Sequence, residues 1–187
     1  MRYIKWIFLI LVLTGVVAFL HYTLPQRDIV RIVNTYEERQ DFGGLKDLFW
    51  KNTGNATADA QVTRDVLFIQ TVKRNGKVMV YRNQDTGFGW PPYFKFDTAD
   101  VQTEAADAQS TAANPQWVVV RHYGWRNSWL LDGIFPNALS IRPIDDPDQT
   151  LVPWLNIVII VVLIALFRMI QVRISRVFRR LRGTKEA

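Results

Sequence analysis

The chain has 187 residues, of which 49% are hydrophobic, 13% are aromatic and none is cysteine. The lack of cysteine excludes disulfide bonds, thiolate metal sites and cysteine nucleophiles. The formal net charge of +6 is concentrated at the two ends, while residues 6–167 are slightly acidic, which argues against a nucleic-acid-binding domain.

The first 26 residues resemble a membrane anchor. Residues 6–26 carry no charge and, at about 1.5 Å per residue, reach roughly 31 Å, close to the ~30 Å thickness of bilayer hydrocarbon. We therefore predict a cytoplasmic N-terminus over residues 1–5 and a transmembrane helix over residues 6–26. A cleaved signal peptide is the alternative, because Val16-Val17-Ala18 matches a cleavage motif. The apolar run continues beyond this motif, which favours retention.

Residues 27–149 read as one β-rich domain. Asn75-Gly76 between two β-rich runs predicts a hairpin with a type I′ turn, and residues 34–60 are polar and read mostly as loop. Good helix formers predict one short helix over residues 98–110. Segments rich in β-branched and aromatic residues predict five strands, at residues 29–33, 66–72, 77–82, 117–123 and 138–142, the last closed by Pro143.

A second uncharged run begins at Thr150 and predicts another transmembrane helix, over residues 150–170. The fold class is therefore a membrane-anchored α+β chain, with two transmembrane helices flanking a small, mainly β periplasmic domain of five strands and one short helix. This element order is also that of an OB-type barrel. Asn156 is an amide inside the second run and predicts a helix–helix contact.

Residues 171–187 form a predicted basic amphipathic tail. Its apolar residues follow one helical stripe, while the other face carries Arg173, Arg176, Arg179, Arg180 and Arg182. Basic residues beside spanning segments stay on the cytoplasmic side, so both termini are expected inside and the domain outside. We expect these arginines to contact anionic headgroups of the inner leaflet, each contributing about 1 kcal/mol. The alternative is a topology anchor with no further role.

Catalytic and metal-binding patterns are weak. His122 shares one face of a predicted strand with Val118 and Val120, which is typical of a histidine with a structural role, and no nearby histidine completes a metal pair. The sequence thus predicts no metal site and no cofactor.

Aromatic residues are dense in two segments of the domain. They include Trp90 and Tyr93 in the first, and Trp125 beside Arg126 in the second. Aromatic residues with arginine are typical of the centre of an interface. The alternatives are that they fill a small β core or rest on the membrane interface.

Four strings of residues carry a resemblance to a known family: His21-Tyr22-Thr23-Leu24-Pro25, Asp28-Ile29-Val30-Arg31-Ile32-Val33-Asn34, Trp90-Pro91-Pro92-Tyr93-Phe94-Lys95-Phe96 and His122-Tyr123-Gly124-Trp125-Arg126. By these the chain resembles an uncharacterised bacterial domain-of-unknown-function family of small two-span inner-membrane proteins. The resemblance implies a bacterial inner membrane and a periplasmic domain, and supplies no catalytic residues.

Three functions follow as expectations. The first is a non-enzymatic inner-membrane protein whose periplasmic domain binds a membrane or periplasmic protein, as an accessory subunit of a membrane complex. The second is a periplasmic module that binds a lipid or small ligand in the mouth of a barrel lined by Trp90, Tyr93 and Trp125. The third is an enzyme that uses His122 with a distant carboxylate.

Overall fold

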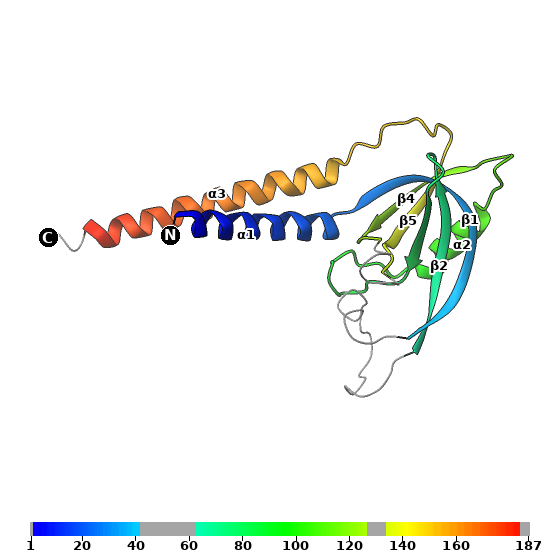
Figure 1. Cartoon of the computed structure of the whole chain (residues 1–187), viewed down its shortest axis with the longest axis horizontal. Coiled ribbons are helices and arrows are strands. Elements are labelled where there is room, and N and C mark those ends of the chain that lie inside the picture. Colours follow the sequence, from blue (N-terminus) through cyan, green and yellow to red (C-terminus); the bar gives the residue numbers. More distant parts are fainter. Residues whose placement is uncertain (1, 42–62, 127–133, 184–187) are drawn as a thin grey trace. The chain divides into compact units, whose positions relative to one another are not determined.

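The computed structural model describes residues 2–41, 63–126 and 134–183. Its contacts divide the chain into two units, Met1–Thr150 and Leu151–Ala187. The first unit holds the helix α1 (Arg2–Thr23) and a β-barrel, and the second holds the helix α3 (Trp154–Gly183) (Figure 1).

Each terminal helix contains a segment that is long and apolar enough to cross a membrane, Tyr3–Thr23 in α1 and Trp154–Arg176 in α3. No residue is buried in the most apolar stretch of either segment, whereas a helix in the core of a soluble protein is buried. Helix α3 begins after Pro153 and continues through the predicted tail to Gly183, so the second apolar run and the basic stripe belong to one helix. The prediction of two long apolar terminal helices is confirmed.

The five strands form a closed barrel with the order β1-β2-β3-β5-β4, in which β4 pairs back with β1. All neighbouring strands are antiparallel except β3 and β5, which are parallel and meet only at Arg82 and Asn137. The helix α2 (Thr98–Asp107) lies between β3 and β4 in the chain. The predicted barrel of five strands and one helix is confirmed; its strands are β1 (Gln26–Asp41), β2 (Thr63–Lys73), β3 (Val78–Asn83), β4 (Trp117–Tyr123) and β5 (Asn137–Ile144).

Strands β1, β2 and β5 are longer than predicted. The loop prediction is wrong for residues 34–41, which belong to β1 and pair with β2. Glu37 and Arg39 in this half of the strand are exposed. Backbone pairing with β2 stabilises this half, and the sequence shows no alternation of apolar residues that would predict it. Strand β5 runs past Pro143, which lies opposite Val118 of β4. Proline is tolerated because β3 pairs with β5 only at Asn137, which leaves the other side of β5 at Pro143 as an open edge.

The predicted hairpin joins β2 to β3, but its turn differs from the prediction. The amide of Gly76 donates to the carbonyl of Lys73 at 2.9 Å, and the amide of Lys73 donates to the carbonyl of Lys77 at 2.9 Å. Gly76 has a φ of 78°, whereas Asn75 does not have a positive φ. The type I′ prediction is therefore wrong, because that turn needs two residues at positive φ; the loop is a type I turn followed by a glycine in the left-handed region.

Apolar side chains from every strand of the barrel fill its interior. Val30, Ile69 and Tyr81 are fully buried there, and α2 adds Val101 and Ala105. A smaller cluster lies around Phe68, where Tyr36 and Phe135 pack against it. Each buried Val, Ile or Phe contributes roughly 1.5–3 kcal/mol of hydrophobic stabilisation, so the barrel has its own core independent of the terminal helices.

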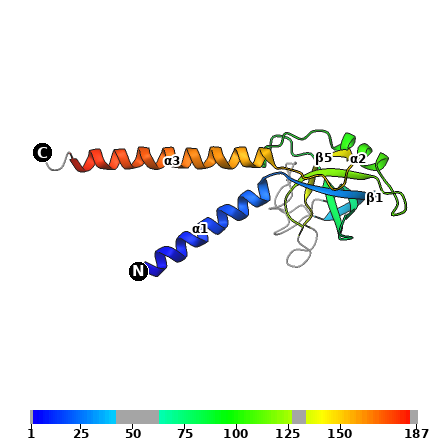
Figure 2. The ribbon, with the colours of Figure 1, turned by 90° about the horizontal axis from the view of Figure 1, so that it is seen from above.

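Helix α1 runs almost directly into β1, with only Leu24 and Pro25 between them (Figures 1 and 2). The junction is fixed to the end of β4, because the amide of Gly124 donates to the carbonyl of Tyr22 at 2.9 Å. Gly124 has a φ of 93°, and an added Cβ would lie 3.5 Å from the Cα of Pro136. That distance is an ordinary van der Waals contact, so glycine is favoured here by the left-handed backbone.

Candidate functional site

The segment of residues 87–96, called the aromatic loop below, connects β3 to α2 and presents aromatic side chains to its surroundings. The exposed fractions are 85% for Phe88, 65% for Trp90, 56% for Phe94 and 59% for Phe96. Phe88 packs edge-on against Phe94 and Phe96, with ring centroids 6.0 and 5.3 Å apart. Contiguous exposed apolar surface of this kind marks interaction sites.

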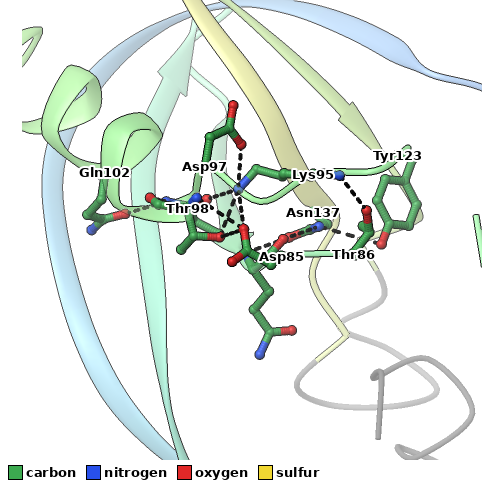
Figure 3. Close-up of polar contacts among 10 residues, drawn as sticks. Asp85, Thr86, Lys95, Asp97, Thr98, Gln102, Tyr123 and Asn137 are labelled. Atoms are coloured by element: carbon green, nitrogen blue, oxygen red, sulfur yellow. Dashed lines mark hydrogen bonds and ion pairs between the residues drawn. The ribbon is translucent and has the colours of Figure 1, made fainter. Parts of the chain in front are cut away.

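The side chain of Lys95 connects the end of the aromatic loop to the strand β3 and to the helix α2 (Figure 3). Its side chain is only 3% exposed. The Nζ atom donates to Oδ1 of Asn83 at 2.7 Å and to Oγ1 of Thr98 at 3.0 Å. Because Asn83 ends β3 and Thr98 begins α2, this one amine joins the loop, the strand and the helix.

Burial lowers the pKa of the Lys95 ammonium, and the carboxylates of Asp97 and Asp85 oppose this shift. These carboxylates lie 3.7 and 4.0 Å from Nζ and are about half exposed. Water screens such partners, so they compensate only partly for the loss of hydration of the ammonium.

A cleft of about 790 Å³, called the loop cleft below, opens beside the aromatic loop. Phe88 and Phe96 supply apolar lining, and Asp65 and Asp85 supply carboxylates. The lining of the loop cleft thus combines aromatic rings with negative charge.

The aromatic loop also contacts the end of α1. Trp90 stacks on Phe19, with ring centroids 5.7 Å apart and an interplanar angle of 14°. The hydroxyl of Tyr93 donates to the carbonyl of Thr23, and its ring stacks on Tyr123 at 5.0 Å. Phe19 and Thr23 belong to the segment that is apolar enough to cross a membrane, so one flank of the loop lies against the end of that segment.

A second polar cluster lies at the beginning of β1. Oδ2 of Asp28 accepts hydrogen bonds from the hydroxyl of Tyr81 at 2.6 Å, from Nζ of Lys73 at 2.8 Å and from Nε2 of His122 at 3.1 Å. Burial by itself raises the pKa of Asp28, but these hydrogen bonds outweigh burial and hold the pKa well below its usual 3.8. Burial, reinforced by the Asp28 charge, raises the pKa of Tyr81 far above its usual 10.0. Asp28 is therefore an ionised carboxylate that joins β1 to β2, β3 and β4.

A cleft of about 550 Å³, called the mouth cleft below, extends from this cluster to the end of α1. Its ionisable lining includes Asp28, Lys73, Lys77 and Arg126 as well as both histidines, His21 and His122. Nε1 of Trp125 donates to Nδ1 of His21 at 2.8 Å and closes the cleft on the α1 side.

The predicted binding residues fall in two places. Trp125 and Arg126 line the mouth cleft, and the guanidinium of Arg126 lies 4.0 Å from the centroid of the Phe135 ring. Trp90 and Tyr93 do not line this cleft, and instead contact the end of α1. The structure thus brings Trp90 and Tyr93 together, and Trp125 and Arg126 together, but does not assemble one barrel mouth from Trp90, Tyr93 and Trp125.

The predicted lipid-contacting and helix-contacting residues lie on α3. Arg173 and Arg176 are exposed, and Asn156 is partly exposed near the start of the helix. The helix also includes positions 179, 180 and 182, whose side chains are outside the described set.

Sequence reasoning missed Asp28, Lys73, Tyr81 and Lys95. Two signals were present: Asp28 opens a β-branched strand, and Lys95 stands alone among aromatic residues. A charged residue in such surroundings is buried only when it has partners. Within the described residues no group of three or more histidines or carboxylates is placed to hold a metal ion.

These observations define a class, a small closed β-barrel joined to helices that are long and apolar enough to cross a membrane. The chain belongs to the family described as "Protein of unknown function (DUF1523)", whose model matches residues 1–179. It is also similar to an "Uncharacterized protein" of Haemophilus influenzae (strain ATCC 51907 / DSM 11121 / KW20 / Rd), with 36% identity over 157 residues that cover 82% of each chain. No solved structure matches the chain significantly.

Proposed function

We propose that this chain is a non-enzymatic protein of the bacterial inner membrane, whose barrel lies in the periplasm and binds another membrane protein through the aromatic loop. The orientation is supported by the charge distribution, since Arg2 and Lys5 precede the first apolar segment and the arginine-rich end of α3 follows the second.

The observation that carries the proposal is the exposed cluster of Phe88, Phe94 and Phe96. Aromatic side chains supply large contact area at low entropic cost and are common at the centres of interfaces. The loop is also held in place before binding, because consecutive prolines restrict its backbone and Lys95 fastens its end. A preorganised loop loses less conformational entropy on binding.

The surroundings of the cluster indicate the chemistry of the partner. Asp65 and Asp85 line the loop cleft with Phe88 and Phe96. Asp65 is paired with Arg39 at 3.0 Å, whereas Asp85 is about half exposed and lies 4.0 Å from Nζ of Lys95, so the Asp85 carboxylate favours a cationic segment over an anionic lipid surface. The stacking of Trp90 on Phe19 places the flank of the loop at the end of the apolar part of α1. The partner that fits is therefore a membrane protein presenting apolar residues and a lysine or arginine.

Site-specific photo-crosslinking tests this proposal. A photoreactive residue at position 88 or 96 is expected to capture one protein in intact cells, while the same residue at Glu104, exposed on α2, captures none. The double variant Phe88→Ser, Phe96→Ser is expected to lose the partner during purification in mild detergent. Crosslinks to lipid alone from positions 88 and 96, or equal capture from position 104, would contradict the proposal.

The pairing of His122 with Asp28 is a specific observation that bears on an enzymatic function. Nε2 of His122 is occupied by Asp28, and its buried Nδ1 has no hydrogen-bond partner in the part of the chain that the structure describes. A histidine acting as general base for a nucleophile requires a hydrogen bond to a hydroxyl or thiol. The hydroxyl nearest to His122 among these contacts is that of Tyr81, and both groups donate to Asp28 instead. We assign the pair a structural role at the barrel mouth.

A further inference from the structure

The mouth cleft is distinct from the aromatic loop, and the charges that line it are unbalanced. Lys73 and Lys77 supply two positive charges against the single carboxylate of Asp28. Asp28 is already paired with Lys73 at 2.8 Å. Across residues 2–41, 63–126 and 134–183, no carboxylate forms an ion pair with Lys77, whose side chain is exposed.

His122 adds an unsatisfied polar atom to the same cleft. It is 3% exposed and its Nδ1 is buried without a hydrogen-bond partner among the described residues. Its Nε2 is already bonded to Asp28, so the ring contributes to the wall of the cleft and not to its charge. A ligand that enters the cleft therefore meets a site with surplus positive charge.

The position of the cleft further limits the kinds of ligand that can bind there. His21 and Trp125 close one end, and His21 lies in the last turn of the α1 segment that is apolar enough to cross a membrane. At this level a bilayer presents its phosphate groups. A lysine pair is also a common point-charge site for phosphate.

We propose that the mouth cleft binds a phosphate group, with Lys77 and Lys73 as the cationic contacts. The phosphate comes either from the headgroup of an anionic lipid or from a soluble phosphate. Lys73 holds its position through Asp28, and Lys77 supplies the charge that no carboxylate of the described residues neutralises. The cleft volume of about 550 Å³ has room for a headgroup.

The test uses the full-length chain and two probes. Inorganic phosphate is titrated calorimetrically into the detergent-purified protein, and native mass spectrometry counts lipids retained from nanodiscs with equal phosphatidylglycerol and phosphatidylcholine. The variants are Lys77→Gln, the charge-retaining Lys77→Arg, and Arg74→Gln as matched control. Arg74 lies in the same hairpin but pairs with Asp148 and does not line the cleft.

We expect Lys77→Gln to weaken binding about fivefold, which corresponds to one lost charge contact, while Lys77→Arg and Arg74→Gln stay close to the wild type. An effect on inorganic phosphate identifies a soluble source, and an effect only on retained phosphatidylglycerol identifies a lipid source. The arginines of α3 add an equal background in all four proteins. Equal binding by Lys77→Gln and Arg74→Gln with both probes, or no binding of either probe by the wild type, would overturn the proposal. The crosslinking at the aromatic loop is independent of either result.

Discussion

Asp28 is the residue on which the open end of the barrel depends. One carboxylate oxygen receives donors from Lys73 of β2, Tyr81 of β3 and His122 of β4. The side chain of Asp28 is 21% exposed, so these bonds form largely away from water, where removal of an acceptor leaves costly unpaired donors.

We expect Asp28→Asn to destabilise the barrel by about 2–3 kcal/mol at neutral pH, because a neutral amide accepts these donors poorly. The pKa of Asp28 is lower in the folded chain than in the unfolded chain. Its contribution to stability is therefore complete above pH 3.8 and is lost as the pH falls below that value. Urea unfolding followed by tryptophan fluorescence, repeated between pH 7 and pH 3, measures both effects. The exposed Glu104→Gln is the control, and an acid transition of equal size in Asp28→Asn would contradict this role.

Lys95 gives the opposite dependence on pH. Its pKa is lowered by burial, so the unfolded chain binds its proton more tightly than the folded chain does. The free energy of unfolding should consequently rise as the pH approaches 10.5, the usual pKa of lysine. We expect this rise to be absent in Lys95→Met and present in Lys77→Met, measured by the same urea unfolding on the alkaline side of neutrality. If the free energy of unfolding of Lys95→Met rises with pH as in the wild type, a group other than Lys95 causes the rise.

For single residues, the sequence indicated which side chains are unusual in their surroundings but not which side chains they contact. His122 was correctly placed in a strand, yet Asp28 is 94 residues away in the chain, and no local spacing encodes such a contact. The same holds for Lys95 and Asn83, whose proximity depends on the path of the aromatic loop.

The β2–β3 hairpin shows how a single turn residue shapes an element. Gly76 has a φ of 78°, and no atom lies within 4 Å of an added Cβ, so the cost of a side chain there is purely conformational. We expect Gly76→Ala to destabilise the barrel by about 1 kcal/mol and Gly76→Asn by less, because asparagine tolerates the left-handed region better. Thermal unfolding of the two variants measures the difference. Equal stability of Gly76→Ala and the wild type would show that the turn relaxes.

Strands and helices with a characteristic local sequence pattern were predicted from the sequence. Segments that are strands only because they pair with a distant strand were not. Strand β4 was predicted over its full length because residues 117–123 are rich in β-branched and aromatic residues. The second half of β1 was missed, since only its pairing with β2 makes it a strand. The single parallel contact of Arg82 with Asn137 closes the barrel, and nothing near either residue in the sequence indicates it.

For the whole molecule, the proposed orientation in the membrane rests on the positive charge at the two ends of the chain. The chain has no cysteine, so one introduced thiol is the only target for a maleimide. We expect Asn75→Cys, at the tip of the hairpin, to react with an impermeant maleimide in spheroplasts, and Ala187→Cys to react only after lysis. The reverse pattern would overturn the periplasmic assignment of the barrel.

The arginines of the C-terminal region should enforce that orientation. Replacing Arg173, Arg176, Arg179, Arg180 and Arg182 together with glutamine removes most of the positive charge that follows the uncharged run of residues 150–167. We expect a measurable fraction of these chains to insert in the opposite orientation, so that the thiol of Asn75→Cys no longer reacts with the impermeant reagent. The Arg74→Gln variant serves as control. Full labelling in the five-site variant would show that the N-terminal charges suffice.

The join between α1 and the barrel has a mechanical consequence. Two separate contacts, from Gly124 to the carbonyl of Tyr22 and from Tyr93 to the carbonyl of Thr23, prevent the helix from swivelling about Pro25. If α1 spans the bilayer as proposed, a tilt of the helix, such as a thinner bilayer imposes, would be transmitted through these two contacts to the end of β4 and to the aromatic loop. The thickness of the bilayer would then bear directly on the conformation of the barrel.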